Sequence, residues 1–453
     1  MTAARLSRLQ GPGVLGATTP GPDLLAAEYR ETEYVATGTA RAFRAKELPA
    51  DGRLLLQPSE SAHYVTRLLI RRPISAEAFN GTVVVEWLNV SGGQDVAPAY
   101  TYLAPELIRR GYVWAGVSAQ WTGVEGGRAA VAGPDDGRQN DRGLKTLDPS
   151  RYHKLTHPGD AYCYDIFTQV TRALRSPEAG HPLHGLGVQK VLAVGASQSA
   201  ATLSTYFNGF QPLSRLFDGF LIHSRAAGVA PLGESGEPIA IEQVLRGEPT
   251  LIRSDQQVPA LVVQTETDLV GALGYARARQ PDSAFFRLWE VAGSAHGDKA
   301  QLGELELRLG CPDPVNRGQQ RYVLRAALRC LDAWSRGIEA PRPAPRLAID
   351  AITPATFVTD SHGNVVGGVR TPCVDAPVAV LSGTARPGVS GICQLFGRTL
   401  PFTPARLRAL YLSVDDYLQQ YRCAAEGAIR AGHVLADDRD ELLAEAHPEL
   451  FSR

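Results

Sequence analysis

The sequence has few cysteines, no excess of charge and no long apolar run, and each absence excludes a class of protein. The six cysteines among 453 residues form no CxxC pair and no zinc-finger spacing, so we expect no metal. A formal net charge of −1 gives no electrostatic basis for binding nucleic acid or an anionic membrane. No segment reaches the roughly 18 apolar residues of a membrane-spanning helix. The first residues also lack the apolar core of a signal peptide, so we expect a cytoplasmic protein.

The cysteines leave one disulfide open as a hypothesis. Cys373 and Cys393 flank two strand-like segments and could pair under oxidising conditions. Cys330 differs, because it lies on an apolar stripe with the spacing of one helix face, and we interpret it as a core thiol.

The apolar segments that are present predict an α/β fold. Residues 30–75 alternate apolar and polar positions, which predicts an antiparallel pair of strands at the N-terminus. Strand-like and helix-like segments then alternate, which is typical of a mostly parallel central sheet with helices on both faces. The expected strands are residues 82–88, 112–118, 189–195, 217–223, 259–265 and 285–291.

The segment VLAVGASQSAATLS, residues 191–204, predicts a nucleophile elbow at Ser197. An apolar strand ends at Gly195 and a helix begins after Ser197, so this serine would stand on a sharp strand-to-helix turn. Such a turn needs small residues two positions before and after the serine, because the strand and helix backbones nearly touch there. Gly195 and Ser199 occupy these positions, and Ser199 departs from the usual GxSxG pattern by one hydroxymethyl group.

A base and an acid for this serine follow in the expected chain order. His296 lies in a small-residue loop directly after the last expected strand, and Asp268 follows the strand before it. Glu266 remains an alternative acid, because two positions along a strand place both carboxylates on one face. His223 ends the strand at 217–223 and is the competing histidine near the pocket, although it precedes both acids.

Stabilising an oxyanion requires two backbone N–H donors. The residue after the nucleophile, Gln198, supplies the first. The second is expected from the loop that follows the strand in NGTVVVEWLNVSGGQD, and Asn89 and Val90 are the candidates.

These motifs together resemble the α/β-hydrolase superfamily, in particular a poorly characterised branch described simply as α/β-hydrolase domain proteins. The similar segments are FNGTVVVEWLNVSGG, DPSRYHKLTHPGDAYCYDIF, GASQS, QTETD, AHGD and HGNVVGGVRTP. The resemblance implies a serine hydrolase fold and carboxylic ester hydrolase activity, but it does not imply a particular substrate. We expect the substrate to be a small-molecule ester. The acyl-enzyme chemistry requires no cofactor. The same residues could instead serve an acyltransferase, and the fold alone could serve a binding protein that does not turn over its ligand.

The chain divides, on this interpretation, into a hydrolase core at residues 1–340 and a C-terminal extension at 341–453 that packs on it. Residues 225–257 form an insertion that either caps the nucleophile or is a surface loop. In the extension, residues 404–421 predict one amphipathic helix. Arg370 could bind a substrate carboxylate or its own backbone. No pattern in the sequence indicates an oligomeric state.

Overall fold

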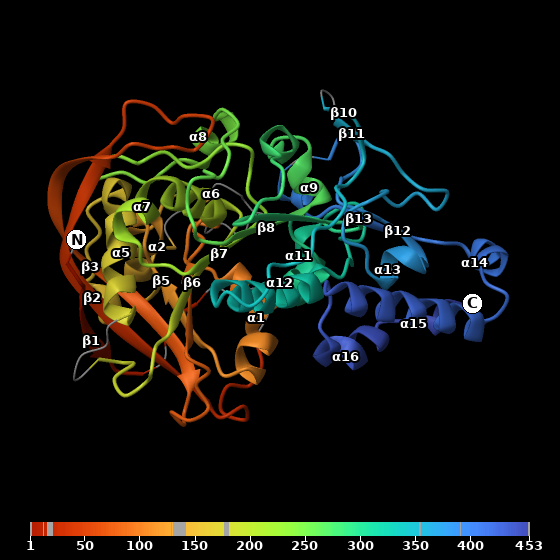
Figure 1. Ribbon diagram of the computed structural model, residues 1–453, viewed down its shortest axis with the longest axis horizontal. Coiled ribbons are helices and arrows are strands. Elements are labelled where there is room, and N and C mark those ends of the chain that lie inside the picture. The colour runs from red at the N-terminus through yellow and green to blue at the C-terminus, as the bar shows by residue number, and fades with distance from the viewer. Residues whose placement is uncertain are drawn as a thin grey trace.

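The computed structural model describes residues 2–11, 13–15, 21–127, 129, 142–175, 181–352, 355–389 and 391–451. A nine-stranded sheet of order β1-β2-β3-β5-β4-β6-β7-β8-β9 forms its centre (Figure 1). The strands are β1 (Arg5–Leu9), β2 (Tyr29–Arg44), β3 (Gln57–Pro73), β4 (Thr82–Trp87), β5 (Val113–Val117), β6 (Lys190–Ala196), β7 (Gly219–His223), β8 (Ala260–Thr265) and β9 (Phe286–Val291).

The sheet confirms the predicted α/β fold. Strands β4 to β9 match the six expected segments to within two residues and pair in parallel. Strands β2 and β3 pair antiparallel over nearly their full length, as the alternation at residues 30–75 predicts. Every residue of β4, β5 and β7 to β9 is buried, because helices cover both faces of the parallel part.

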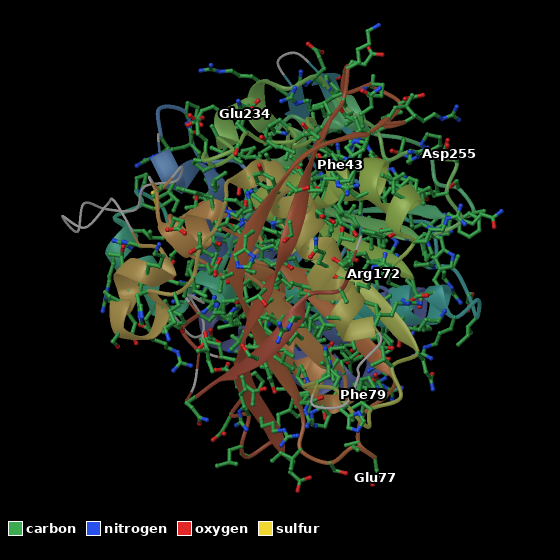
Figure 2. The ribbon with its side chains drawn as sticks, turned by 90° about the vertical axis from the view of Figure 1, so that its left-hand side faces the viewer. Phe43, Glu77, Phe79, Arg172, Glu234 and Asp255 are labelled. Atoms are coloured by element: carbon green, nitrogen blue, oxygen red, sulfur yellow. A yellow bond between two sulfur atoms is a disulfide. The ribbon has the colours of Figure 1, made fainter. Side chains whose placement is uncertain are left out.

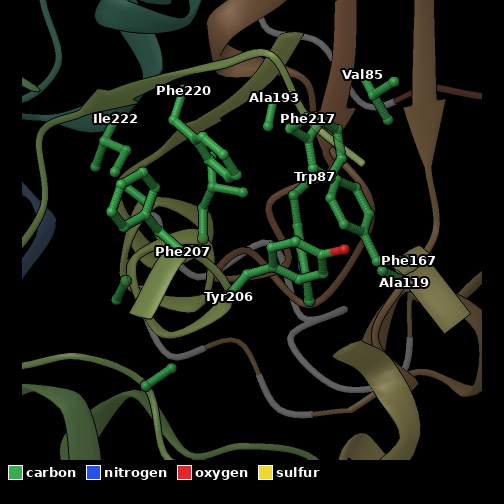
Figure 3. Close-up of a cluster of buried hydrophobic side chains, with 14 of the residues drawn as sticks. Val85, Trp87, Ala119, Phe167, Ala193, Tyr206, Phe207, Phe217, Phe220 and Ile222 are labelled. Carbon is green, nitrogen blue, oxygen red and sulfur yellow. The ribbon is translucent and has the colours of Figure 1, made fainter. Parts of the chain in front are cut away.

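Two helices on each face hold the strands that carry the site. On one face, α1 (Pro98–Arg109) and α12 (Gln320–Ser335) pack through a cluster that includes Leu103 and Leu328. On the other face, α5 (Cys163–Arg175) and α6 (Gln198–Thr205) share an aromatic cluster with the sheet, which Figure 3 shows around Trp87 and Phe167. The ring centroids of this pair lie 4.6 Å apart. This ring pair packs α5 against β4.

The remaining elements are short, except for α15, which has 18 residues. The helices are α2 (Trp121–Glu125), α3 (Leu144–Leu147), α4 (Pro149–Tyr152), α7 (Gln211–Ser214), α8 (Ile241–Arg246), α9 (Glu266–Leu269), α10 (Lys299–Leu302), α11 (Glu306–Leu309), α13 (Pro372–Asp375), α14 (Pro404–Leu410), α15 (Val414–Ala431) and α16 (Arg439–Leu443). Two hairpins are formed by β10 (Ile349–Ile352) with β11 (Ala355–Phe357) and by β12 (Ala379–Ser382) with β13 (Arg398–Pro401). Single turns of 3₁₀ or π-helix cover Asp160–Tyr162, Tyr206–Phe210, Tyr275–Ala278, Gly303–Leu305, Gly391–Leu395, Ala436–Asp438 and Pro448–Phe451.

The insertion at 225–257 contains the one-and-a-half-turn helix α8, whose Val244 is buried in the same cluster as α6. Its backbone bonds to the loop after β2, where the Leu251 N–H donates to the Ala50 carbonyl oxygen at 2.8 Å. A role as a cap over Ser197 stays a prediction.

The C-terminal extension adds a bridge to the central sheet. Within the extension, the single helix predicted at residues 404–421 is interrupted. Val369 forms a bridge beside Val291 at the end of β9. The predicted helix is two helices, α14 and α15, because Ser413 caps α15 by accepting the Asp416 N–H at 3.1 Å. The Asp416 carboxylate in turn accepts the Leu412 N–H at 2.8 Å. These local bonds start a new helix and end the previous one.

The disulfide of the structure joins Cys311 to Cys393, with Cα atoms 5.6 Å apart. The hypothesis of a Cys373–Cys393 pair is therefore wrong. Cys373 is a free thiol in α13, and its sulfur lies 3.2 Å from the Thr371 hydroxyl. The segment that carries Cys393 packs instead on Leu309 at the end of α11 and on Cys311 in the loop that follows. Cys330 is a free thiol that is half-buried beside the apolar stripe of α12.

Candidate active site

Ser197 stands at the corner between β6 and α6 in a conformation that favours glycine. Its backbone has φ 62° and ψ −122°, which costs on the order of 1–3 kcal/mol for a residue with a side chain. The Ser197 N–H donates to the His223 carbonyl oxygen at 2.9 Å. A Cβ atom on Gly195 would lie 2.9 Å from the Ser199 carbonyl oxygen, so the strand and helix do approach as closely as the elbow requires.

Ser199, the departure from the usual pattern, has a local function. Its hydroxyl donates to the Ala196 carbonyl oxygen at 2.9 Å and accepts the Ala196 N–H at 3.0 Å. The extra hydroxymethyl group therefore bonds both backbone polar groups at the end of β6, and it stabilises the elbow.

The side chain of His296 lies between the predicted nucleophile and the predicted acid. Its Nε2 is 2.8 Å from Ser197 Oγ, and its Nδ1 is 2.7 Å from Asp268 Oδ1. The His296 side chain is 10% exposed and that of Asp268 is fully buried. Three residues spread over a hundred positions of sequence thus form one continuous hydrogen-bonded chain.

Asp268 is held as a carboxylate by its neighbours. Burial raises its pKa, but the His296 imidazole and the Thr265 N–H outweigh burial, and the pKa lies below the usual value. The second carboxylate oxygen accepts the Thr265 N–H at 2.7 Å and its hydroxyl at 2.8 Å. Both oxygens are therefore committed, one of them to His296.

Glu266, the alternative acid, points away from the histidine. The two residues are not alternate positions of a strand, because β8 ends at Thr265 and α9 begins at Glu266. The Glu266 carboxylate accepts the Gly293 N–H at 2.6 Å and the Gly383 N–H at 2.7 Å. Complete burial raises its pKa to about 7. This side chain joins the loop after β9 to the C-terminal extension.

The hydrogen-bond partners of their backbone N–H groups distinguish Asn89 from Val90 as oxyanion candidates. Gln198 is the first residue of α6, where a backbone N–H has no partner within the helix. The Asn89 N–H is committed to the Val96 carbonyl oxygen at 2.9 Å. The Val90 N–H makes only a long 3.4 Å contact to the Gln198 Oε1. Of these two backbone N–H groups, that of Val90 is the one that could switch to a stronger acceptor.

His223 lies close to Asp268 and His296 and is neutral. Burial lowers its pKa to about 4. Its Nε2 is 3.2 Å from the Gln320 Oε1, and its Nδ1 is buried without a hydrogen-bond partner in the described residues. Because the amide oxygen can only accept, the proton lies on Nε2.

Gln320, which the sequence analysis does not single out, supports the loop that carries His296. Its fully buried amide donates to the Ala295 carbonyl oxygen and to the Asp298 carboxylate, both at 2.8 Å. Ala295 and Asp298 flank His296 on either side. The sequence gives only a weak signal for this role, since a single glutamine at the start of a helix is not part of a recognisable motif.

Arg370 lies in the hydrogen-bond network of the extension. It bonds the Asp375 carboxylate at 2.5 Å, the Val365 carbonyl oxygen at 2.7 Å and the Asp360 carboxylate at 3.3 Å. These contacts correspond to the second of the two roles expected for it, binding to its own chain.

A cavity of about 950 Å³ lies between the extension and the core, and its lining includes Tyr102, Cys373 and Tyr421. Ser197, Asp268 and His296 are not among its lining residues. Within the described ranges, no three histidine, cysteine or acidic side chains gather as a metal site would require. The helices of this same part of the chain include none with the length and apolar character needed to cross a bilayer.

Comparison with known proteins places the chain among hydrolases. The family model described as "Alpha/beta hydrolase domain" matches residues 5–444. Similar solved structures include one from a study of two fungal esterases from Rhizomucor miehei (13% identity, 70% of this chain and 88% of the other, TM-score 0.34) and a ferulic acid esterase from Streptomyces cinnamoneus (14%, 72% and 96%, TM-score 0.33). Est1E from Butyrivibrio proteoclasticus, solved with ferulic acid, is similar at 9% identity (60% and 96%, TM-score 0.32). Among curated proteins, none matches the sequence.

Proposed function

Because the chain belongs to the alpha/beta hydrolase domain family, we propose that it is a serine hydrolase that cleaves a carboxylic ester. One observation carries the proposal: the Ser197 hydroxyl, the His296 imidazole and the Asp268 carboxylate form an unbroken chain with distances of 2.8 and 2.7 Å. A serine hydroxyl is a weak nucleophile until a base removes its proton, and this arrangement supplies the base and its orienting acid.

The first step forms an acyl-enzyme. Ser197 Oγ attacks the ester carbonyl carbon and its proton passes to His296 Nε2. The negative charge on the carbonyl oxygen is stabilised by the N–H groups of Gln198 and Val90, the latter released from its long contact to Oε1. The carbon–oxygen bond to the alcohol then breaks, and the departing alkoxide takes the proton from His296.

The second step releases the acid. Water loses a proton to His296 and attacks the acyl carbon, and the proton returns to Ser197 Oγ as the bond to the acyl group breaks. Asp268 fixes the imidazole and stabilises its cation in both steps. The same acyl-enzyme passes its acyl group to an alcohol in an acyltransferase, so product analysis with an added alcohol separates the two activities.

The decisive test combines an activated aryl ester with a fluorophosphonate probe. We expect burst release of the phenol and covalent labelling at Ser197, with both lost in Ser197→Ala. Ser204→Ala is the matched control, because this hydroxyl lies in the same helix and bonds the Ala200 carbonyl oxygen at 2.8 Å, without contact to His296. It should keep both signals.

Two results would contradict the proposal. Absence of labelling in the folded wild-type protein near neutral pH would favour a binding protein on the same fold. Full turnover in Ser197→Ala would assign the nucleophile to another residue.

A further inference from the structure

A basic pocket at the far end of the sheet has no relation to the triad. Its volume is about 280 Å³, and it is lined by Arg8, Arg30, Thr32, Tyr34, Arg72, His181 and Pro182. The lining contains three arginines and a histidine but no acidic residue. We propose that this pocket binds a tetrahedral phosphate dianion, either free or as the phosphate group of a larger molecule.

The register of the three N-terminal strands places the basic side chains together. Arg30, Thr32 and Tyr34 are alternate residues of β2, so they share one face of the sheet. Arg72 of β3 pairs directly with Arg30, and Arg8 of β1 pairs directly with Tyr34. In Figure 2, β2 and β3 run across the face turned to the viewer, between the regions labelled Phe43 and Phe79.

Two guanidinium groups directly across an antiparallel pair repel one another. Arg72 donates to the Pro73 carbonyl oxygen at 3.1 Å, and Arg30 is exposed. Within the described residues, neither side chain has a carboxylate partner. An anion bound between them would relieve this repulsion.

The opposite face of the same strands shows that this lack of partners is local. There Arg71 pairs with Glu31 at 2.8 Å, and Arg67 pairs with Asp95 at 2.7 Å. The other face of the ribbon thus neutralises its arginines with acids of its own chain. On the pocket face, Arg30 and Arg72 have no carboxylate partner in the described residues and can bind an anion.

His181 also lines the pocket, and its imidazole has one nitrogen without a partner in the described residues. Its Nδ1 accepts the Leu183 N–H at 3.1 Å, and burial lowers its pKa to about 4. The neutral ring therefore carries its proton on Nε2. That atom is buried and has no hydrogen-bond partner in the described part of the chain. Guanidinium forks with one imidazole N–H and the hydroxyls of Thr32 and Tyr34 suit the three or four oxygens of a phosphate.

Titration calorimetry with inorganic phosphate, at ionic strength held constant with chloride, tests the proposal. We expect saturable binding to the wild-type protein and a loss of affinity of at least about tenfold in Arg30→Gln and in Arg72→Gln. Arg5→Gln is the matched control, because Arg5 is an exposed arginine of β1 on the opposite face, paired with Thr37. Its affinity should stay within about twofold of wild type.

Thermal unfolding gives a second measurement that does not depend on a weak heat signal. In phosphate-free buffer, Arg72→Gln should unfold at a higher temperature than wild type, because the repulsion with Arg30 is gone. Added phosphate should raise the unfolding temperature of wild type and of Arg5→Gln, but not of Arg72→Gln.

The source of the phosphate is distinguished with phenyl phosphate. Tighter binding of phenyl phosphate than of inorganic phosphate indicates a phosphate ester, and the reverse indicates the free ion. The proposal is overturned if wild type binds neither compound, or if Arg5→Gln loses affinity as much as Arg30→Gln does. Turnover of an aryl ester by the same variants should be unchanged, so this result is independent of the proposed hydrolase function.

Discussion

Asp268 and Glu266 lie two positions apart, yet only one of them touches the histidine. Replacing Asp268 by Asn keeps the side-chain shape but removes the charge that orients His296 and stabilises its cation. We expect turnover of an aryl ester to fall by about 10⁴-fold, the scale known for this substitution in a serine triad. Steady-state kinetics of Asp268→Asn against wild type measures the effect. A loss of less than tenfold would assign the orienting role elsewhere.

Glu266→Gln should damage stability and leave turnover nearly intact. The carboxylate accepts one N–H from Gly293 and one from Gly383, whereas an amide has a single oxygen and directs its NH₂ group at the other donor. We expect a loss of about 1–3 kcal/mol in the free energy of unfolding. Urea denaturation compared with kinetics on the same sample checks both parts. If turnover falls as in Asp268→Asn, Glu266 takes part in catalysis.

His223 makes the fold sensitive to acid. Burial lowers its pKa from 6.5 to about 4, so between these values the unfolded chain binds a proton that the folded protein does not. Stability is therefore lost as the pH falls from 6.5 toward 4, by about 2 to 3 kcal/mol from this residue at about pH 4.5. His223→Gln keeps an N–H donor toward Gln320 but cannot titrate. Its free energy of unfolding should fall less over this window.

The control for this prediction is His63→Gln, since His63 is exposed on β3. It should follow the wild-type pH dependence. An equal fall in wild type and His223→Gln would show that His223 does not control the acid sensitivity.

At the level of single residues, sequence order could single out Ser197 and His296 as candidates, because the elbow and the loop after the last strand have recognisable patterns. It could not separate Asp268 from Glu266, because the choice depends on where β8 ends and the α9 turn begins. It could not separate Val90 from Asn89 either, since the bond that occupies the Asn89 N–H comes from a residue seven positions later.

Among the secondary-structure elements, α12 matters because its first residues support the loop that carries the base. Gln320→Ala removes the bonds to Ala295 and Asp298, and His296 loses part of its positioning. A displacement of about 1 Å in such a site lowers the rate by about 10²-fold. We expect kcat to fall on this scale with little change in KM, and the fluorophosphonate labelling rate to fall with it.

The neighbouring glutamine provides the matched control for this element. Gln319 donates to the Tyr421 hydroxyl at 2.6 Å and accepts the Cys373 N–H at 3.1 Å, so it supports the extension and not the histidine loop. Gln319→Ala should lower stability and leave the labelling rate of the folded fraction unchanged. Equal effects of both variants on labelling would remove the positioning role from Gln320.

The ends of an element could be predicted where both faces of a strand are buried. They could not be predicted where local capping determines where a helix begins or ends. The strands β4 to β9 are nearly continuous apolar segments, which bury both faces and end where polar residues begin. Residues 404–421 keep one apolar periodicity across a break, because the leucines and tyrosines of α14 and α15 pack into the same cluster. The apolar periodicity reflects which side chains pack into this cluster, whereas Ser413 and Asp416 determine where α14 ends and α15 begins.

In the whole molecule, the extension is part of the site's support. Gly383 bonds the Glu266 carboxylate and the Thr267 hydroxyl, and Thr267 in turn accepts the His296 N–H at 3.1 Å. The Gly297 N–H donates to the Leu395 carbonyl oxygen at 3.0 Å. The loops that carry Asp268 and His296 are thus hydrogen-bonded to residues from 383 onward. Sequence periodicity could not reveal this, because glycine amides leave no pattern.

The Cys311–Cys393 disulfide joins the segment after α11 to the extension, across a sequence separation of 82 residues. It determines how many thiols the chain has. We expect iodoacetamide to label four cysteines in denatured, unreduced protein, namely Cys163, Cys330, Cys373 and Cys423, and six after reduction.

Removing a disulfide of this kind costs about 2–5 kcal/mol in the free energy of unfolding, so Cys311→Ser should unfold at a lower urea concentration than wild type. Cys423→Ser should not, because Cys423 is an exposed free thiol. Disulfides persist in oxidising compartments. Six labelled cysteines in unreduced protein from its native cells would mean that the disulfide is absent in those cells, as the prediction of a cytoplasmic protein requires. Four labelled cysteines would contradict the prediction of a cytoplasmic protein.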